Sequence, residues 1–344
     1  MAVPASGARV RLSDIAEEAG VSVALVSKVL NGRADVAPTT RRKVEDLLAK
    51  YSYRPRRAPA RASTHLVDLV INELDSAWSL EIVEGVAKVA QDNDAATVVS
   101  VLSGGEEHEV QRWLRNLTHR RSDGVVLVVS QLSRRHLARL ARLGVPVVAV
   151  DPAGEPDEEL PTIGATNWSG GFAAAEHLVG LGHRRIAVIT GPQDVLCSRA
   201  RLDGFRAALD RAGVDLPASM LRHGAFTTES GERWGSDLLA HRDAPTAIFC
   251  GSDQQAFGVY AAARRRGLSV PADLSVVGFD GLPATTWVTP PLTTVRQPLR
   301  DVAGLATEML LQLIRGQALQ SRRVELATSL VVRESTCPPR DVRA

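Results

Sequence analysis

Near the N-terminus, apolar residues recur at the three- and four-residue spacing of short amphipathic helices. Within residues 12–31, Val26, Val29 and Leu30 fall on one face of the second of two such helices. A third helix is predicted to open at Pro38, a residue suited to the first helical position. Its apolar stripe consists of Val44, Leu47, Leu48 and Tyr51. The pattern predicts a small three-helix core at the start of the chain.

Two serines mark the predicted starts of the first two helices. The hydroxyls of Ser13 and Ser22 can each accept a backbone N–H that has no partner inside the helix. Gly20 lies between them and supplies the left-handed backbone that ends a helix. The outward face of the second helix begins with the small side chains of Val23 and Ala24. This shape predicts a helix-turn-helix whose second helix can enter the major groove of DNA.

Beyond residue 65 the pattern changes to short β-branched runs that alternate with helix-like segments. The first strands are predicted at residues 66–71, 97–101, 124–129 and 147–150, and a helix follows each of the first three. A second series consists of a helix at 168–181, a strand at 186–190, a helix at 200–212 and strands at 247–249 and 275–277. A helix at 300–314 and a strand-like stretch at 324–332 end the pattern. Two successive α/β units predict two lobes with parallel sheets and a ligand cleft between them, at the carboxyl ends of the strands.

These patterns divide the chain into four parts. We expect a helix-turn-helix headpiece at residues 1–53, a basic linker at 54–64, a two-lobed core at 65–337 and a tail at 338–344. The linker contains Pro55 and Pro59, which cannot both lie inside one helix. Free in solution, the linker is therefore expected to be extended.

The charge distribution distinguishes the front of the chain from the rest. Residues 1–65 contain 12 Lys and Arg against 6 Asp and Glu, whereas the remainder contains 29 against 33. The net charge of +2 conceals this asymmetry. Because the basic charge coincides with helical patterning, it indicates a module that binds phosphates. With 344 residues, of which 44% are hydrophobic, the chain can build two or three domains.

The sequence also bears on where the protein acts. No apolar run is long enough to span a membrane, and the first residues lack the apolar region of a signal peptide. Cys197, Cys250 and Cys337 are odd in number and widely spaced, which fits neither a metal motif nor a disulfide framework. We therefore expect a cytoplasmic protein with no membrane partner and no metal site.

No constellation of catalytic residues is visible in the sequence. Gly180 and Gly182 lack the third glycine of a dinucleotide-binding fingerprint, and they follow a helix instead of a strand. No nucleophile elbow, Walker loop or zinc spacing occurs, and the eight histidines are scattered. His177 and His183 are expected to cap a helix or to lie on its surface. We predict no catalytic residue and no cofactor.

The headpiece, linker and two α/β lobes together resemble the LacI/GalR family of bacterial transcriptional repressors. The matching motifs cover nearly the whole chain and lie at residues 14–22, 26–31, 53–55, 181–186, 201–205, 277–280 and 291–295. The resemblance implies a core similar to periplasmic sugar-binding proteins, which binds an effector and forms a homodimer, or in some members a tetramer. Because the residues after Val331 lack the apolar heptads of a tetramerising tail, a dimer is favoured.

The resemblance implies a partner, double-stranded operator DNA, and a set of residues that contact it. Val23, Ala24 and Lys28 would face base edges, where a lysine can donate to guanine and small apolar groups can pack on a thymine methyl. The full set is Ser22, Val23, Ala24, Ser27, Lys28, Asn31 and Tyr53 from the headpiece, with Arg56, Arg57 and Arg61 from the linker. The linker departs from the family's hinge helix, because Pro59 falls inside it and Ala62 stands near the position of a DNA-wedging leucine. Our hypothesis is that the linker arginines follow the backbone or a narrow minor groove.

For the effector, the resemblance implies a cleft suited to a mono- or disaccharide. The implied residues are Trp78, Ser79, Asp151, Arg201, Phe226, Ser252, Asp280 and Gln297. Aromatic faces and charged groups of this kind bind sugar rings and neighbouring hydroxyls. Each residue also has an ordinary structural interpretation, such as a turn former for Asp151 or a solvated helix residue for Arg201. Residues 76–79 read Ser-Ala-Trp-Ser where the family usually has Asn-Pro-Phe-Phe, so no particular sugar follows.

We therefore predict a DNA-binding repressor controlled by a sugar, in which ligand closes the cleft and shifts the population away from the DNA-binding form. Two alternatives stay open. One is a cytoplasmic sugar-binding protein without operator specificity, and the other, less favoured, is an α/β enzyme.

Overall fold

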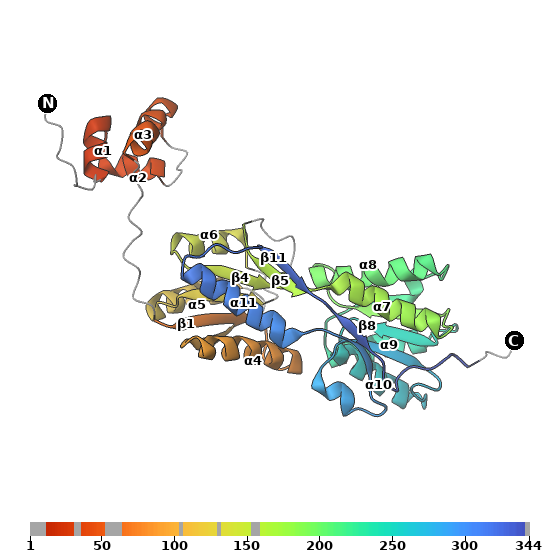
Figure 1. The fold of residues 1–344 in the computed structure, drawn as a ribbon. Coiled ribbons are helices and arrows are strands. Elements are labelled where there is room, and N and C mark those ends of the chain that lie inside the picture. The colour runs from red at the N-terminus through yellow and green to blue at the C-terminus, as the bar shows by residue number, and fades with distance from the viewer. Residues whose placement is uncertain are drawn as a thin grey trace. The chain divides into compact units, whose positions relative to one another are not determined.

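The computed structural model describes residues 12–30, 36–51, 64–102, 106–128, 132–152 and 159–340 (Figure 1). The chain divides into two compact units, residues 1–63 and 64–344. The described part of the first unit consists of the helices α1 (Leu12–Ala19), α2 (Val23–Leu30) and α3 (Pro38–Lys50). The second unit holds all of the described strands.

The three helices of the first unit pack around a small apolar core. Its buried members are Ile15, Ala16, Ala19, Val26, Val29, Val36 and Val44. Leu47, Leu48 and Tyr51 lie partly buried against it. The predicted stripes of α2 and α3 are confirmed, except that the side chain of Leu30 lies outside the described part of the chain.

Three residues are predicted to mark the ends of α1 and α2, and two of them do so. Ser22 caps α2, because the backbone N–H of Leu25 donates to its hydroxyl at 3.2 Å. Gly20 has a φ of +68°, the left-handed conformation that ends α1. The prediction for Ser13 is wrong, because Ser13 lies inside α1, which the structure describes from Leu12 onward. The Ser13 hydroxyl instead donates to the carboxylate of Asp14, at 3.1 Å.

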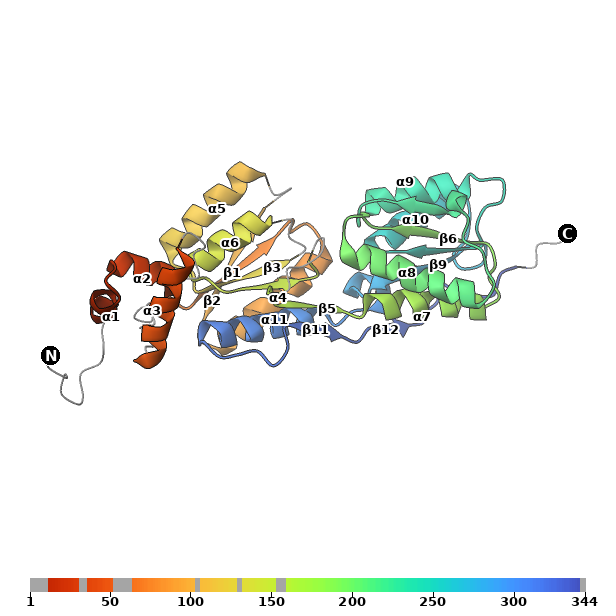
Figure 2. The same ribbon diagram turned by 90° about the horizontal axis from the view of Figure 1, so that it is seen from above.

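The second unit contains two six-stranded sheets, one in each lobe (Figure 2). The N-lobe sheet has the order β11-β5-β4-β3-β1-β2 and the C-lobe sheet has the order β12-β10-β9-β8-β6-β7. The strands are β1 (Leu66–Ile71), β2 (Ala96–Val101), β3 (Gly124–Val128), β4 (Val147–Val150), β5 (Thr162–Ala165), β6 (Ile186–Thr190), β7 (Leu221–His223), β8 (Ala247–Cys250), β9 (Ser275–Asp280), β10 (Thr293–Arg296), β11 (Arg323–Leu326) and β12 (Ser329–Val331). All described pairs are parallel except β10 with β12. The predicted two-lobed α/β core with parallel sheets is confirmed.

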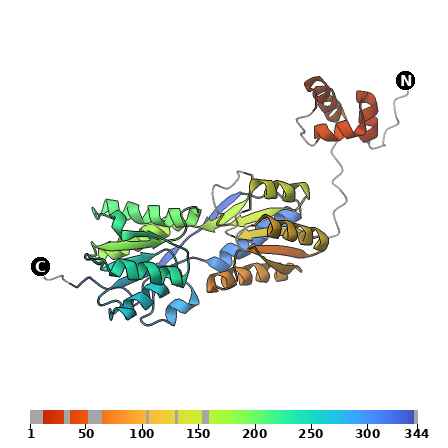
Figure 3. The same ribbon diagram turned by 180° about the vertical axis from the view of Figure 1, so that it is seen from behind.

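Helices cover both faces of each sheet (Figures 1 and 3). They are α4 (Ala77–Asp92), α5 (Glu107–Arg120), α6 (Arg134–Arg142), α7 (Asn167–Gly180), α8 (Leu196–Arg211), α9 (Thr228–Leu239), α10 (Asp253–Arg265) and α11 (Leu299–Ile314), with short 3-10 turns η1 (Ala218–Met220) and η2 (Pro283–Thr286). In the N-lobe, Ile82 of α4 and Leu310 of α11 share one apolar core, whereas Trp113 of α5 and Leu140 of α6 share the core on the other face. In the C-lobe, α7 and α8 pack on one face, and α9 and α10 on the other.

The chain crosses between the lobes more than once. After β10 it returns to the N-lobe, where α11 packs on α4 and β11 pairs with β5, and it then enters β12 of the C-lobe. The single strand-like stretch predicted at 324–332 is therefore wrong, because it forms two strands in different sheets. Thr328 lies between them, and its backbone N–H donates to the hydroxyl of Thr166, the residue before α7, at 2.9 Å. The crossing from β5 to α7 and the crossing from β11 to β12 are thus hydrogen-bonded to each other.

His183 is not a surface or capping residue, so that prediction is wrong. Its side chain is buried, with Nδ1 at 2.8 Å from the Thr246 hydroxyl and Nε2 at 2.9 Å from the carbonyl oxygen of Cys337. Burial lowers the pKa of His183. The ring connects the turn after α7 to the C-terminal segment, a contact that local sequence patterns do not predict.

Two glycines allow α7 and α8 to cross at close range. A Cβ atom on Gly204 would lie 1.9 Å from the carbonyl oxygen of Trp168, and one on Gly171 would lie 2.0 Å from that of Arg201. Both obstacles are backbone atoms, which a rotamer change cannot move. The crossing brings α8 against the first turn of α7.

A Gly204→Ala variant should therefore be destabilised, by about 1–3 kcal/mol, because the two helices must move apart. Urea denaturation of the purified protein measures this loss. Gly180→Ala is the matched control, since nothing lies within 4 Å of a Cβ atom at that position. That control should match the wild type or exceed it by up to about 1 kcal/mol. Equal stability of Gly204→Ala and wild type would contradict the close crossing.

Candidate functional site

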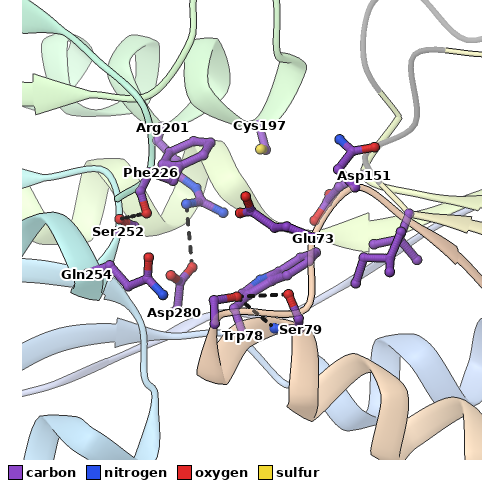
Figure 4. A pocket seen from close by; sticks show the side chains of 14 residues that line it. Glu73, Trp78, Ser79, Asp151, Cys197, Arg201, Phe226, Ser252, Gln254 and Asp280 are labelled. Carbon is purple, nitrogen blue, oxygen red and sulfur yellow. Dashed lines mark hydrogen bonds and ion pairs between the residues drawn. The ribbon is translucent and has the colours of Figure 1, made fainter. Parts of the chain in front are cut away.

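A pocket lies between the two lobes, at the carboxyl ends of their strands (Figure 4). Its cavity volume is about 120 Å³, below the usual range of small-molecule sites, and the cavity opens to solvent. The residues that line it are Ile71, Asn72, Glu73, Ser76, Trp78, Ser79, Val128, Asp151, Cys197, Arg201, Phe226, Ser252, Gln254 and Asp280. Both sheets therefore direct polar side chains to one cavity, as parallel sheets commonly do at ligand sites.

The structure brings seven of the eight effector residues named from the sequence to this pocket. They are Trp78, Ser79, Asp151, Arg201, Phe226, Ser252 and Asp280. Gln297 does not line the pocket, but its Nε2 donates to Asp280 Oδ1 at 2.8 Å. Sequence reasoning missed Ile71, Asn72, Glu73, Ser76, Val128, Cys197 and Gln254. A usable signal existed for Asn72 and Glu73, because both directly follow the predicted strand at 66–71.

Arg201 is the central cation of the pocket. It lies on α8 and is almost completely buried. Its Nε donates to Asn167 Oδ1 at 2.8 Å and its Nη1 donates to the carbonyl oxygen of Gly251 at 2.5 Å. Its guanidinium carbon lies 3.8 Å from the ring centroid of Phe279, a cation–π contact. These contacts fix the guanidinium in place before any ligand binds.

Asp280 faces Arg201 from the end of β9. Its Oδ1 lies 3.6 Å from Arg201 Nη1 and also accepts the hydrogen bond from Gln297. Burial raises the pKa of Asp280 to about 6, although Arg201 and Gln297 both act to lower it. Asp280 has a φ of +118°, a strained conformation for a residue with a side chain. Strain of this kind is common at ligand sites, where it re-aims a side chain.

Asp151 presents a second carboxylate, directly after β4 in the N-lobe. Its φ of +42° lies in the left-handed region. A Cβ atom on Gly164 of the neighbouring β5 would lie 2.6 Å from Asp151 Oδ1, so a glycine there makes room for the carboxylate. Burial raises the pKa of Asp151 to about 6, whereas the positive charge of Arg201 lowers it.

Aromatic rings and serines complete the wall. Trp78 comes from the first turn of α4, and Phe226 from the loop after β7. A Cβ atom on Gly191 would lie 2.1 Å from the Phe226 ring, so the glycine allows the ring to reach the pocket. The Ser252 hydroxyl caps α10 and donates to the carbonyl oxygen of Phe226 at 3.4 Å.

The pocket is lined by hydrogen-bonding groups, aromatic rings and one thiol. Burial raises the pKa of Cys197 to about 12, so this thiol is protonated at neutral pH and a poor nucleophile. Among the described residues, no group of three or more His, Cys, Asp or Glu side chains could hold a metal ion. Hydrogen-bonding groups and aromatic faces around one cavity fit a small polar ligand.

In the first unit, the start of α2 presents the small residues named for DNA contact. Ser22, Val23 and Ala24 are exposed, and Val23 keeps 48% of its surface accessible although it is apolar. The side chains of Ser27 and Lys28 lie outside the described part of the chain, as do Asn31, Tyr53, Arg56, Arg57 and Arg61 altogether. Their DNA contacts therefore stay predictions.

A helix-turn-helix unit joined to a two-lobed unit with an inter-lobe pocket defines a class of protein: a DNA-binding regulator that takes a small-molecule ligand. Residues 11–56 match the family model "Bacterial regulatory proteins, lacI family", and residues 175–336 match the "Periplasmic binding protein-like domain". The described helices include none with the length and apolarity that a membrane span requires.

Known proteins resemble the chain over nearly its whole length. The ribose operon repressor of Escherichia coli (strain K12) is 35% identical over 332 residues, which cover 94% of this chain and 99% of the repressor. The transcriptional regulator CelR–cellobiose complex is 32% identical with a TM-score of 0.74, over 95% of this chain and all of that one. The lac repressor dimer bound to operator and the anti-inducer ONPF is 31% identical with a TM-score of 0.70, over 96% and 100%. The chain belongs to the LacI family of bacterial transcriptional regulators, as its sequence motifs predict.

Proposed function

We propose that the chain is a repressor whose affinity for operator DNA is controlled by a mono- or disaccharide bound between its lobes. The observation that carries this proposal is the pocket, in which seven of the eight residues named from sequence motifs meet. A sugar fits this lining, because carboxylates and a guanidinium bind neighbouring hydroxyls and aromatic rings bind the C–H faces. The names of the ribose operon repressor and the CelR–cellobiose complex support the same ligand class.

On the DNA side, we propose that α2 enters the major groove with Val23, Ala24 and Lys28 toward the bases. Ser22, Ser27, Asn31 and Tyr53 then bind phosphates, and the linker arginines Arg56, Arg57 and Arg61 follow the backbone or the minor groove. The exposure of Val23 and Ala24 at the start of α2 supports the first part, since large side chains there would hold the helix away from the groove.

We also propose that the protein acts as a homodimer. Exposed apolar side chains occur on α4 and on the neighbouring edge strand β2: Leu80 is 61% exposed, Val99 37% and Val101 43%. An apolar sheet edge left open to water favours association with a second chain. Two headpieces held by such a dimer would read a near-palindromic site, in the bacterial cytoplasm where operator DNA lies.

Ligand control follows from the position of the pocket. Asp151 belongs to the N-lobe, whereas Arg201 and Asp280 belong to the C-lobe. A sugar that binds all three holds the lobes in one relative position and so favours one of two conformations. The sugar can change the affinity for DNA only as far as it binds one of the two conformations more tightly than the other. We assign no catalytic step to the pocket, because its thiol is protonated and its arginine is hydrogen-bonded to Asn167 and ion-paired with Asp280.

A gel shift tests this proposal. The protein should select a near-palindromic duplex from a random DNA pool, bind it as two chains per duplex, and release it when the right sugar is added. The panel consists of D-ribose, D-glucose, D-xylose and cellobiose. Absence of DNA selection would contradict the regulator, a single chain per duplex would contradict the dimer, and selection without any sugar response would contradict the effector class.

A further inference from the structure

Glu73 is a pocket residue that no family motif assigned. It lies in the loop after β1, two residues beyond the end of the strand, and lines the pocket from the N-lobe. Figure 4 shows its side chain extending from this loop into the cavity. Among the residues that the structure describes, none makes a hydrogen bond or ion pair with its carboxylate. An acceptor with two oxygens therefore faces the ligand space with no partner in the described part of the chain.

Arg201 and Asp280, in contrast, are already engaged with each other. Arg201 is the one cation among the described lining residues, and it donates to Gly251 and Asn167 and pairs with Asp280. With Asp151 included, three carboxylates surround the cavity against one guanidinium. The cavity is therefore negative at neutral pH.

The surroundings of Glu73 agree with a site for a hydrogen-bond donor. Glu73 is exposed to solvent, and partial desolvation and the nearby charge of Asp75 raise the pKa of its carboxyl, so its negative charge gains no stabilisation from the described protein groups. A ligand hydroxyl that donates to the carboxylate would compensate it. A ligand phosphate or carboxylate would instead add like charge in a partly desolvated cavity.

We propose that Glu73 binds hydroxyl groups of the effector and makes the pocket selective for uncharged sugars over their phosphorylated or oxidised derivatives. This inference rests on the proposed function of the pocket. Glu73 supplies the N-lobe contact opposite Arg201 and Asp280, so a sugar held by all three spans the cleft. Its carboxylate acts by charge-assisted hydrogen bonds, which discriminate more sharply than bonds between neutral groups.

The experiment compares neutral and anionic sugars on the full chain. Isothermal titration is done with D-ribose against D-ribose 5-phosphate and with D-glucose against D-glucose 6-phosphate, alongside cellobiose and D-gluconate. Wild type should bind at least one neutral sugar, and its anionic derivative at least tenfold more weakly. Glu73→Gln should weaken binding of the neutral sugar at least tenfold. The ratio of its affinity for the neutral sugar to its affinity for the anionic derivative should also become smaller than in wild type.

Glu159→Gln is the matched control. Glu159 lies in the same lobe before β5 and does not line the pocket, and its side chain is 85% exposed. This variant should bind every sugar as wild type does, and both variants should keep the melting temperature of the ligand-free protein. Unchanged sugar affinity in Glu73→Gln, or a phosphorylated sugar that wild type prefers, would overturn the inference while leaving the sugar-controlled repressor intact. Absence of binding by every sugar to wild type would overturn both.

Discussion

An Arg201→Ala variant should lose its response to sugar and should unfold with a free energy about 3–5 kcal/mol lower than that of wild type. Arg201 is buried and ion-paired with Asp280, so its removal leaves a buried carboxylate without its cation. The pocket also loses the group that would bind neighbouring hydroxyls in a bidentate way. DNA binding should persist below the unfolding temperature, because the helix-turn-helix belongs to the other compact unit.

Two further variants separate folding from binding. Arg199→Ala removes an exposed arginine from the same helix and should leave both stability and sugar response unchanged. Arg201→Ala combined with Asp280→Asn should recover part of the lost stability, because the unpaired charge is gone, yet it should still ignore sugar. Urea denaturation and the sugar-dependent gel shift measure the two effects. A sugar response that survives in Arg201→Ala would remove this residue from the effector site.

The carboxylates of the pocket were predictable to the extent that they follow strands. Asp151 and Asp280 each stand after a β-branched run, and the carboxyl ends of parallel strands meet at one edge of a sheet. Arg201 carries no such signal, because a helical arginine is usually solvated, and only the family motif at 201–205 singled it out. Glu73 also follows a strand, but nothing local shows that its loop meets the C-lobe.

Other parts of the fold depend on contacts that local patterns do not contain. The short strand β5, Thr162–Ala165, includes a glycine and shows no alternation of polar and apolar residues. The stretch at 324–332 is uniformly strand-like, and only the separation of the two sheets divides it into β11 and β12. His183 is polar and follows a glycine turn, yet the C-terminal segment buries it. In each case the deciding partner lies far away in sequence.

The pocket should also make the stability of the protein depend on pH. Burial raises the pKa values of Asp151 and Asp280 to about 6, from 3.8 for an exposed carboxyl group. A carboxyl whose pKa is higher in the folded state binds its proton more tightly there, so the folded state is favoured most below the unfolded pKa. This contribution to the free energy of unfolding is lost as pH rises from about 4 to about 6, and the loss is complete above about pH 6. For Asp151 the loss is about 3 kcal/mol, at 1.36 kcal/mol per pKa unit, and the loss from Asp280 has the same sign.

An Asp151→Asn variant isolates this effect, because an amide of nearly the same shape cannot ionise. Relative to wild type, its free energy of unfolding should increase by about 3 kcal/mol between pH 4 and pH 7. Urea denaturation at half-unit pH steps measures the difference, and Asp203→Asn, on the exposed face of α8, controls for the loss of one negative charge. A constant difference between Asp151→Asn and wild type over this range would show that Asp151 is not held in a desolvated pocket.

The same carboxylate should make sugar binding depend on pH, since a sugar that donates hydroxyls to the ionised Asp151 stabilises its charge. Sugar affinity of the wild type should therefore fall as pH drops below 6, while that of Asp151→Asn, weaker at neutral pH, should depend less on pH.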